Sequence, residues 1–173
     1  VDSAAGVSTA VEHLKNTGRR RIGFLNGPIV TNPGKKRVSA YENALKTFSL
    51  SPVPGAIIQA DAFSPEAGYD AMKYFENLIH LDSIVCANDQ LAAGLMKYCD
   101  ENQISIPDDV AIVGIDNTDL ASLLRPTLTS IDLHAEHRGA LAAQLMLDRL
   151  ANPDRPIQRV VVDPTLVIRN STV

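Results

Sequence analysis

Four polar or aromatic residues come after short apolar runs of the sequence: Arg37, Phe63, Asn88 and Asp116. Together they offer a guanidinium group, an aromatic ring, an amide and a carboxylate. Planar polar groups of these kinds bind adjacent hydroxyls in pairs, while an aromatic ring packs against the apolar face of a sugar. The set therefore predicts a binding site for a neutral, polyhydroxylated small molecule, and a purine base would suit it as well.

Each of these residues also has a purely structural interpretation. Arg37 follows two lysines, and basic clusters of this kind are usually solvated. An isolated aromatic residue such as Phe63 is typical of a core, while Asn88 and Asp116 are of the types that form turns. What favours a binding site is that Arg37, Asn88 and Asp116 share one position, beyond the end of a predicted strand.

The sequence offers little for catalysis. It contains no Gly-x-Ser-x-Gly motif, no Gly-x-Gly-x-x-Gly motif and no P-loop. His134 and His137 could share a helix face, but no third metal ligand stands nearby. The segment from Asp116 to Asp119 lacks the glycine and the distal glutamate of a calcium loop. An enzyme would have only these two aspartates at the strand ends, so we expect no catalytic residues, no metal and no cofactor.

The stretch from Ser83 to Gln90 organises the predicted fold. Its apolar residues without alternation predict a central buried strand at 83–86, followed by a helix that Asp89 is expected to cap. Further strands are expected at 22–25, 56–59 and 110–115. Helices are expected over 4–17, along Val38 to Phe48, from Pro65 to Ile79 through Phe75, and along Leu91 to Cys99, with a loop from 26 to 36.

Alternation of helix and strand with short connections is typical of a doubly wound α/β fold with a parallel sheet. In such a sheet the loops at the carboxyl ends of the strands face one crevice, so the four candidate residues are expected to converge there. Beyond Arg125 and Pro126 the pattern changes. We expect a strand at 128–131, a helix over 139–150, and two closing strands at 160–162 and 166–168 that Pro164 separates.

Composition bounds the class of protein. The chain has 173 residues, of which 45% are hydrophobic and 21% charged, which fits one globular domain or one and a fraction. A net charge of -4 gives no electrostatic footprint for nucleic acid, so the chain alone should not bind DNA. Cys86 and Cys99 are expected as free thiols in a reducing compartment. No apolar run is long enough to span a membrane.

Several segments, taken in order, closely resemble the lactose/galactose-repressor (LacI/GalR) family of bacterial transcription regulators. The resemblance lies in Gly18 to Phe24, Gly27-Pro28, Arg37 and Tyr41, Ala87 to Ala92, Ile106 to Val110, Val113 to Asp116, Pro126 to Ile131 and Pro164 to Thr172. It implies part of a periplasmic-binding-protein-like (type I) effector-binding core. It also implies that Arg37, Asn88 and Asp116 contact the effector and that Phe63 stacks on it.

The resemblance implies a division of the chain as well. Residues 1–130 are expected to form the C-terminal subdomain, 131–163 a crossover that belongs to the N-terminal subdomain, and 164–173 a return strand. The helix-turn-helix headpiece and the first half of the N-terminal subdomain would be absent. The apolar face from Ala142 to Leu150 would then lack its host sheet. Asn117 and Ala135 depart from residues common in the family, so the ligand cannot be taken from any one relative.

The resemblance implies a cytoplasmic homodimer that binds a small effector, namely a sugar, a purine or a phosphorylated metabolite. Operator DNA would be bound only through the missing headpiece, and no membrane is expected as a partner. The helix after Asp89 would supply part of the dimer contact through Leu91 and Leu95, unless these residues belong to the core of one chain. The alternative function is that of a periplasmic sugar-binding protein.

Overall fold

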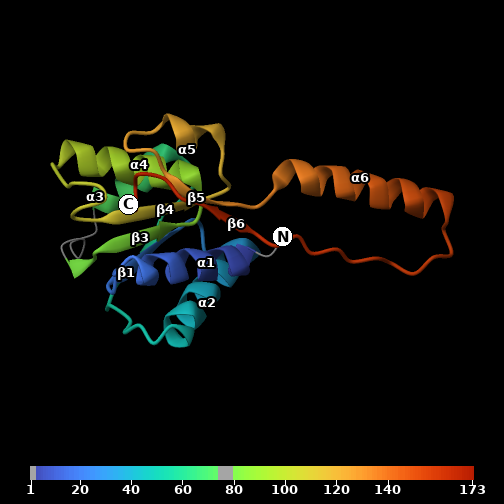
Figure 1. Cartoon of the computed structure of the whole chain (residues 1–173), viewed down its shortest axis with the longest axis horizontal. Coiled ribbons are helices and arrows are strands. Elements are labelled where there is room, and N and C mark those ends of the chain that lie inside the picture. The colour runs from blue at the N-terminus through green and yellow to red at the C-terminus, as the bar shows by residue number, and fades with distance from the viewer. Residues whose placement is uncertain (1–2, 74–79) are drawn as a thin grey trace.

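A six-stranded sheet runs through the body of the molecule, with helices on both of its faces (Figure 1). The computed structural model describes residues 3–73 and 80–173. The elements in chain order are α1 (Ser3–Asn16), β1 (Ile22–Asn26), α2 (Asn32–Thr47), β2 (Ile57–Gln59), α3 (Pro65–Lys73), β3 (Ser83–Cys86), α4 (Asp89–Glu101), β4 (Ala111–Ile115), α5 (Asp119–Leu123), β5 (Thr129–Asp132), α6 (Ala135–Ala151) and β6 (Thr165–Val167).

The strand order is β2-β1-β3-β4-β5-β6, and the first five strands are parallel. From β1 the chain moves outward to β2, and it then returns to add β3 on the other side of β1. This reversal places α1 and α2 on one face of the sheet and α3, α4 and α5 on the other (Figure 1). The predicted doubly wound fold is therefore confirmed. The strand β6 pairs antiparallel with β5 and closes the sheet.

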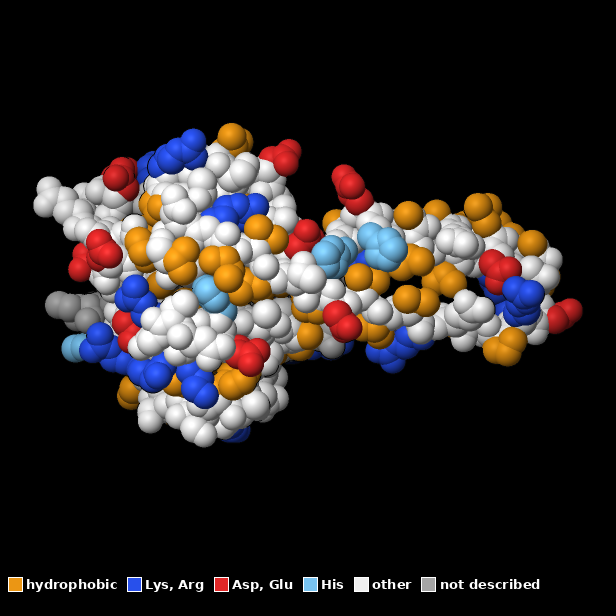
Figure 2. Space-filling view, in the orientation of Figure 1, with side chains coloured by type: hydrophobic (Ala, Val, Ile, Leu, Met, Phe, Trp, Pro, Cys, Tyr) orange, Lys and Arg blue, Asp and Glu red, His pale blue; other side chains and the backbone are white. Residues whose placement is uncertain are grey.

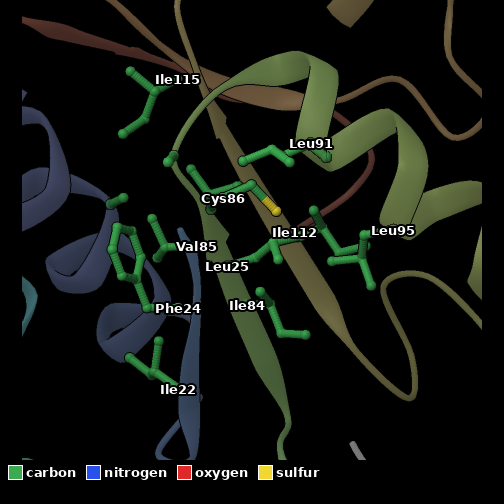
Figure 3. Close-up of a cluster of buried hydrophobic side chains, with 14 of the residues drawn as sticks. Ile22, Phe24, Leu25, Ile84, Val85, Cys86, Leu91, Leu95, Ile112 and Ile115 are labelled. Atoms are coloured by element: carbon green, nitrogen blue, oxygen red, sulfur yellow. The ribbon is translucent and has the colours of Figure 1, made fainter. Parts of the chain in front are cut away.

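The core fills both faces of the central strands. Every residue of β1, β3 and β4 is buried. Figure 3 shows Ile22, Phe24 and Val85 on the side of α1 and α2, whereas Leu25 and Ile84 point toward α4. Each large apolar side chain buried in this way contributes about 1.5–3 kcal/mol. Strands buried on both faces explain why their sequences show no alternation.

Two of the predicted helices differ from the structure or extend outside the described residues. The helix α2 begins at Asn32, inside the predicted loop, because the Thr31 side chain accepts a hydrogen bond from the Gly34 amide and a proline occupies the first turn. Of the residues expected on the third helix, Phe75 and Ile79 lie outside the described residues. Cys86 and Cys99 are buried free thiols, as expected.

The expected strand at 160–162 is wrong, since residues 152–164 form no strand. A strand needs a neighbouring strand for its backbone hydrogen bonds. This segment runs back beside α6 and has no strand of the sheet next to it (Figure 1). We call residues 135–164, which comprise α6 and this returning segment, the arm. No residue of α6 is buried. Within the described residues, no helix combines the length and apolar character needed to cross a membrane.

Leu91 and Leu95 have no exposed surface, 0% in each case. They pack against the sheet from α4 (Figure 3). A side chain that is fully buried within one chain cannot contact a second copy, so the predicted dimer contact through these two leucines is wrong. The interpretation of this stripe as the core of one chain holds instead.

Candidate functional site

A pocket of about 350 Å³ opens at the carboxyl edge of the sheet. It lies where α2, the turn after β4 and the start of the arm meet. Arg37 and Asp116 both line it, so the structure brings together two of the predicted site residues. The remaining lining residues are Asn32, Pro33, Lys36, Leu133 and Arg138.

Arg37 lies in the second turn of α2, and its side chain is half-buried. Its guanidinium carbon lies 5.7 Å from the centre of the Phe63 ring, which is a cation–π distance. Desolvation by burial lowers the pKa of Arg37, and the charge of Asp116 opposes this shift. The solvated helix start that the sequence allowed does not describe this residue, because the guanidinium is packed against an aromatic face.

Asp116 directly follows β4 in a turn with positive φ angles, 107° at Asp116 and 48° at Asn117. The turn is held to β5 because the Asp116 amide donates to the Ile131 carbonyl (2.9 Å) and the Asn117 amide donates to Ser130 Oγ (3.0 Å). Although the residue is exposed, partial desolvation raises the pKa of its carboxyl to about 6. The charge of Asp89 raises this pKa further, while Arg37 and Arg138 lower it.

Phe63 fits its structural interpretation as a residue of the core, and its stacking on an effector stays a prediction. It is half-buried and packs against the core, and its ring is also the surface on which the Arg37 guanidinium rests. The ring lies so close to Gly27 that a Cβ atom at that position would collide with it. Phe63 is therefore fixed beside Arg37, but it does not line the pocket that Arg37 shares with Asp116.

Asn88 has the capping role that the sequence predicted for Asp89. Asn88, and not Asp89, caps α4, because Asn88 Oδ1 accepts a hydrogen bond from the Leu91 amide (2.9 Å). The side chain lies at the carboxyl end of β3 and is half-buried. It does not line the pocket of Arg37 and Asp116. Its contact with a ligand remains a prediction.

Asp89 holds the strand ends together from within the core. It is 1% exposed, and its carboxylate accepts hydrogen bonds from the Thr118 amide (2.7 Å), Thr118 Oγ1 (2.9 Å) and Ser130 Oγ (2.6 Å). Burial raises its pKa, while these hydrogen bonds lower it. Asp89 thus joins α4 to the turn after β4 and to β5. Through this turn it positions Asp116.

Sequence reasoning missed Arg138 and Leu133 as residues of the pocket. Arg138 lies in the first turns of α6, and its guanidinium donates to the Leu133 carbonyl (3.3 Å). Nothing in the local sequence marks this arginine, because its neighbours in the pocket are far away along the chain. Lys36 lines the pocket as well, although it had been assigned to a solvated cluster.

The pocket joins basic side chains to one carboxylate and to an apolar rim from Leu133. Such a set can bind hydroxyl groups, a polar ring edge or an anionic group through charge-assisted hydrogen bonds. Within residues 3–73 and 80–173, no three His, Cys, Asp or Glu side chains are grouped so that they could hold a metal ion. The arrangement is suited to recognition of a small polar molecule.

Comparisons with known proteins show the family to which the chain belongs. Residues 11–172 match the family model of the periplasmic binding protein-like domain. The HTH-type transcriptional repressor PurR of Klebsiella pneumoniae is 34% identical over 173 residues, which cover 99% of this chain and 50% of the relative. The chain thus spans about half the length of the curated relatives that it matches.

Two solved structures resemble the chain over nearly its full length. The complex of the transcriptional regulator CelR with cellobiose has a TM-score of 0.89 and 27% identity, and the match covers 99% of this chain and 52% of that one. A LacI family transcriptional regulator from Enterococcus faecium, with bound ribose, has a TM-score of 0.88 and 25% identity. That match covers 99% of this chain and 63% of the regulator.

Proposed function

The chain belongs to the periplasmic binding protein-like family of domains, as a LacI/GalR-type effector-binding core, and we propose that it binds the small-molecule effector of a DNA-binding transcription repressor. The observation that carries this proposal is that Arg37 and Asp116 line the same pocket at the carboxyl edge of the sheet. Ligands of doubly wound folds bind at this edge.

The proposed effector is a sugar, a purine or a phosphorylated metabolite. Arg37 and Asp116 would hydrogen-bond its polar edge in pairs, and Phe63 would support Arg37 and stack on the ligand. Asn88 would offer its amide nitrogen, since its oxygen caps α4. The two solved relatives contain bound sugars, cellobiose in one and ribose in the other, which supports a polyhydroxylated ligand here.

We propose that residues 1–130 and 164–173 form the C-terminal subdomain and that residues 131–163, which include α6, are a crossover that belongs to the N-terminal subdomain. The exposure of Met146, Leu147 and Leu150, at 65%, 68% and 67%, supports this division because apolar side chains of a helix normally pack on a neighbour. The second subdomain would complete the ligand cleft above Arg37 and Asp116.

The repressor would act in the cytoplasm as a homodimer, bind operator DNA through a separate headpiece and change its affinity for DNA when the effector binds. The relatives named above are transcription regulators, which favours this function over that of a periplasmic sugar-binding protein. It also favours binding over catalysis as the task of Asp116.

Thermal unfolding of the longer protein that contains this chain would test the proposal. The ligands would be two sugars, ribose and cellobiose, one phosphorylated metabolite, ribose 5-phosphate, and one purine, guanine. A ligand at about 100 times its dissociation constant stabilises the folded state by about 2.7 kcal/mol. We expect one ligand to raise the unfolding temperature and to alter the affinity for operator DNA. A shift that persists in Arg37→Ala and Asp116→Ala would contradict the site.

A further inference from the structure

Two buried polar atoms beside the proposed effector site have no hydrogen-bond partner among the described residues. They are Asn26 Oδ1 and Arg37 Nε. The first can only accept a hydrogen bond, and the second can only donate one. A buried polar group without a partner destabilises the folded protein, so two such groups of complementary kind call for an explanation.

The contacts of Asn26 place it under the turn of α2 that precedes Arg37. Asn26 ends β1 and has 0% of its surface exposed, and its Nδ2 donates to the Gly34 carbonyl (3.2 Å). Gly34 lies three residues before Arg37, on the same face of the helix. Long side chains on a helix lean back over the preceding turn. The inner part of the Arg37 side chain therefore runs over the turn that Asn26 contacts.

The other side of Arg37 is closed by Phe63, whose ring centre lies 5.7 Å from the guanidinium carbon. That ring rests against Gly27, the residue directly after Asn26. Asn26 is thus linked to the surroundings of Arg37 from two sides, through Gly34 on α2 and through its neighbour Gly27 under the Phe63 ring. A Cβ atom at Gly34 would lie 2.5 Å from the Pro28 carbonyl oxygen. The first turn of α2 therefore lies closely against the loop between β1 and α2.

We propose that Asn26 is a positioning residue for Arg37, and that in the ligand-free protein a rotation of the Arg37 side chain brings its Nε–H into a hydrogen bond with Asn26 Oδ1. The pairing satisfies both buried atoms at once. It leaves the two terminal nitrogens of the guanidinium free to act as a fork toward the pocket, which is the geometry of bidentate recognition. Its consequence for effector binding rests on the proposed function, whereas the pairing itself does not.

Exchange of the Arg37 Nε–H proton with water, measured by NMR on the 15N-labelled 173-residue chain, tests the pairing without any ligand. The Arg37→Lys variant identifies the signal, because lysine has no Nε–H of this kind. We expect slow exchange in the wild type and exchange at least about tenfold faster in Asn26→Leu, which keeps the side-chain volume but has no acceptor. Asn26→Asp keeps the accepting oxygen and loses the bond to Gly34, and it should retain slow exchange.

Fast exchange in the wild type, or equally slow exchange in Asn26→Leu, would overturn the proposal. Equally fast exchange in Asn26→Leu and Asn26→Asp would also overturn it, since the bond to Gly34 would then be what matters. If Asn26→Leu does not fold, the wild-type rate and Asn26→Asp still decide. Slow exchange that depends on Asn26, in a protein whose unfolding temperature responds to none of the four ligands above, would support the pairing and count against the proposed function alone.

Discussion

Arg37 and Asp116 line one pocket, and both are partly desolvated before any ligand arrives. Part of the hydration that a polar group must lose on binding is therefore already lost in the folded protein. Groups held in this way contribute more to affinity than the same groups in full contact with water, because less of the gain is offset by desolvation and ordering. These two residues should consequently dominate effector affinity.

Truncation of either residue should leave a polar group of the ligand without a partner. For Arg37→Ala and Asp116→Ala we expect a loss of about 1–3 kcal/mol each, which is about 5- to 150-fold in Kd. The measurement is titration calorimetry on the longer protein with the ligand found by thermal unfolding. Arg20→Ala and Asp108→Ala are matched controls, because both residues are exposed and lie before β1 and β4, at the opposite edge of the sheet. Equal losses in the controls would refute the site.

Asn88 requires a substitution that separates capping from binding. Asn88→Asp keeps an oxygen that can cap α4 and loses the amide nitrogen, so stability should change little. If the nitrogen contacts the effector, affinity should fall by about 1–3 kcal/mol. Asn88→Ala, in contrast, should also lower the free energy of unfolding by about 1 kcal/mol. Unchanged affinity in Asn88→Asp, measured by calorimetry, would leave Asn88 with the capping role alone.

Effector affinity should also depend on pH through Asp116, whose pKa is raised to about 6. As the pH falls through this value the carboxylate is protonated, so Kd should rise, by up to about tenfold per pH unit if only the ionised form binds. The stability of the fold depends on pH in the opposite direction, because folding disfavours the ionised form of Asp116. The contribution of this carboxyl to the free energy of unfolding increases as the pH falls from above 6 toward the ordinary pKa of aspartate. Calorimetry between pH 5 and pH 8, with Asp116→Asn as the control, should show the dependence only in the wild type.

At this scale the sequence predicted that Arg37 and Asp116 lie together at the strand ends, but it assigned the cap of α4 to the wrong residue. Both Asn88 and Asp89 are good capping residues, and local sequence cannot choose between them. The choice is made by Thr118 and Ser130, which are distant along the chain and bind the Asp89 carboxylate. Arg138 was missed for the same reason, because its position in the pocket depends on a distant part of the fold.

At the scale of elements, periodicity predicted the alternation of strands and helices, and its errors have local causes. Proline and glycine after Thr31 suggested a loop, yet a proline after a capping threonine is also typical of a helix start. Gly34 is needed there because the Pro28 carbonyl leaves no room for a side chain. The run at 160–162 has the composition of a strand but no neighbouring strand with which to pair.

The packing of α3 against α4 gives a prediction for stability. A Cβ atom at Gly94 would collide with backbone atoms of Pro65 and Tyr69, which no change of rotamer can relieve. Gly94→Ala should therefore lower the free energy of unfolding by about 1–3 kcal/mol or more, despite the higher helix propensity of alanine. Chemical denaturation of the 173-residue chain measures this change.

Gly139→Ala provides the matched control within α6. No atom outside its own helix lies within 4 Å of a Cβ at this position, so only the gain in propensity remains. We expect no loss of stability in this variant. Similar stabilities for both variants would show that α3 and α4 do not pack as closely as the structure has them.

At the scale of the whole molecule, the arm differs from the body in how its apolar side chains are used. Figure 2 shows apolar side chains along both α6 and the returning segment. Among them Ile157, Val160 and Val161 are 89%, 52% and 57% exposed, in addition to the three exposed residues of α6 named above. The family resemblance predicted that this face would lack its host sheet. Periodicity alone could not predict this, because an amphipathic pattern shows that a helix has an apolar face but not which part of the protein covers that face.

The amides of residues 138–150 should therefore exchange hydrogen rapidly in the isolated 173-residue chain. Burial stabilises a helix by about 25 cal/mol per Å² of apolar area, and α6 has no buried residue from which to gain this. A single helix without tertiary packing is marginally stable in water. Hydrogen exchange followed by mass spectrometry should show little protection over 138–150 and strong protection of β3, which is the internal control. In the longer protein the same residues should become protected. Strong protection in the isolated monomer would mean that α6 packs on the body, and the division into subdomains would then be wrong.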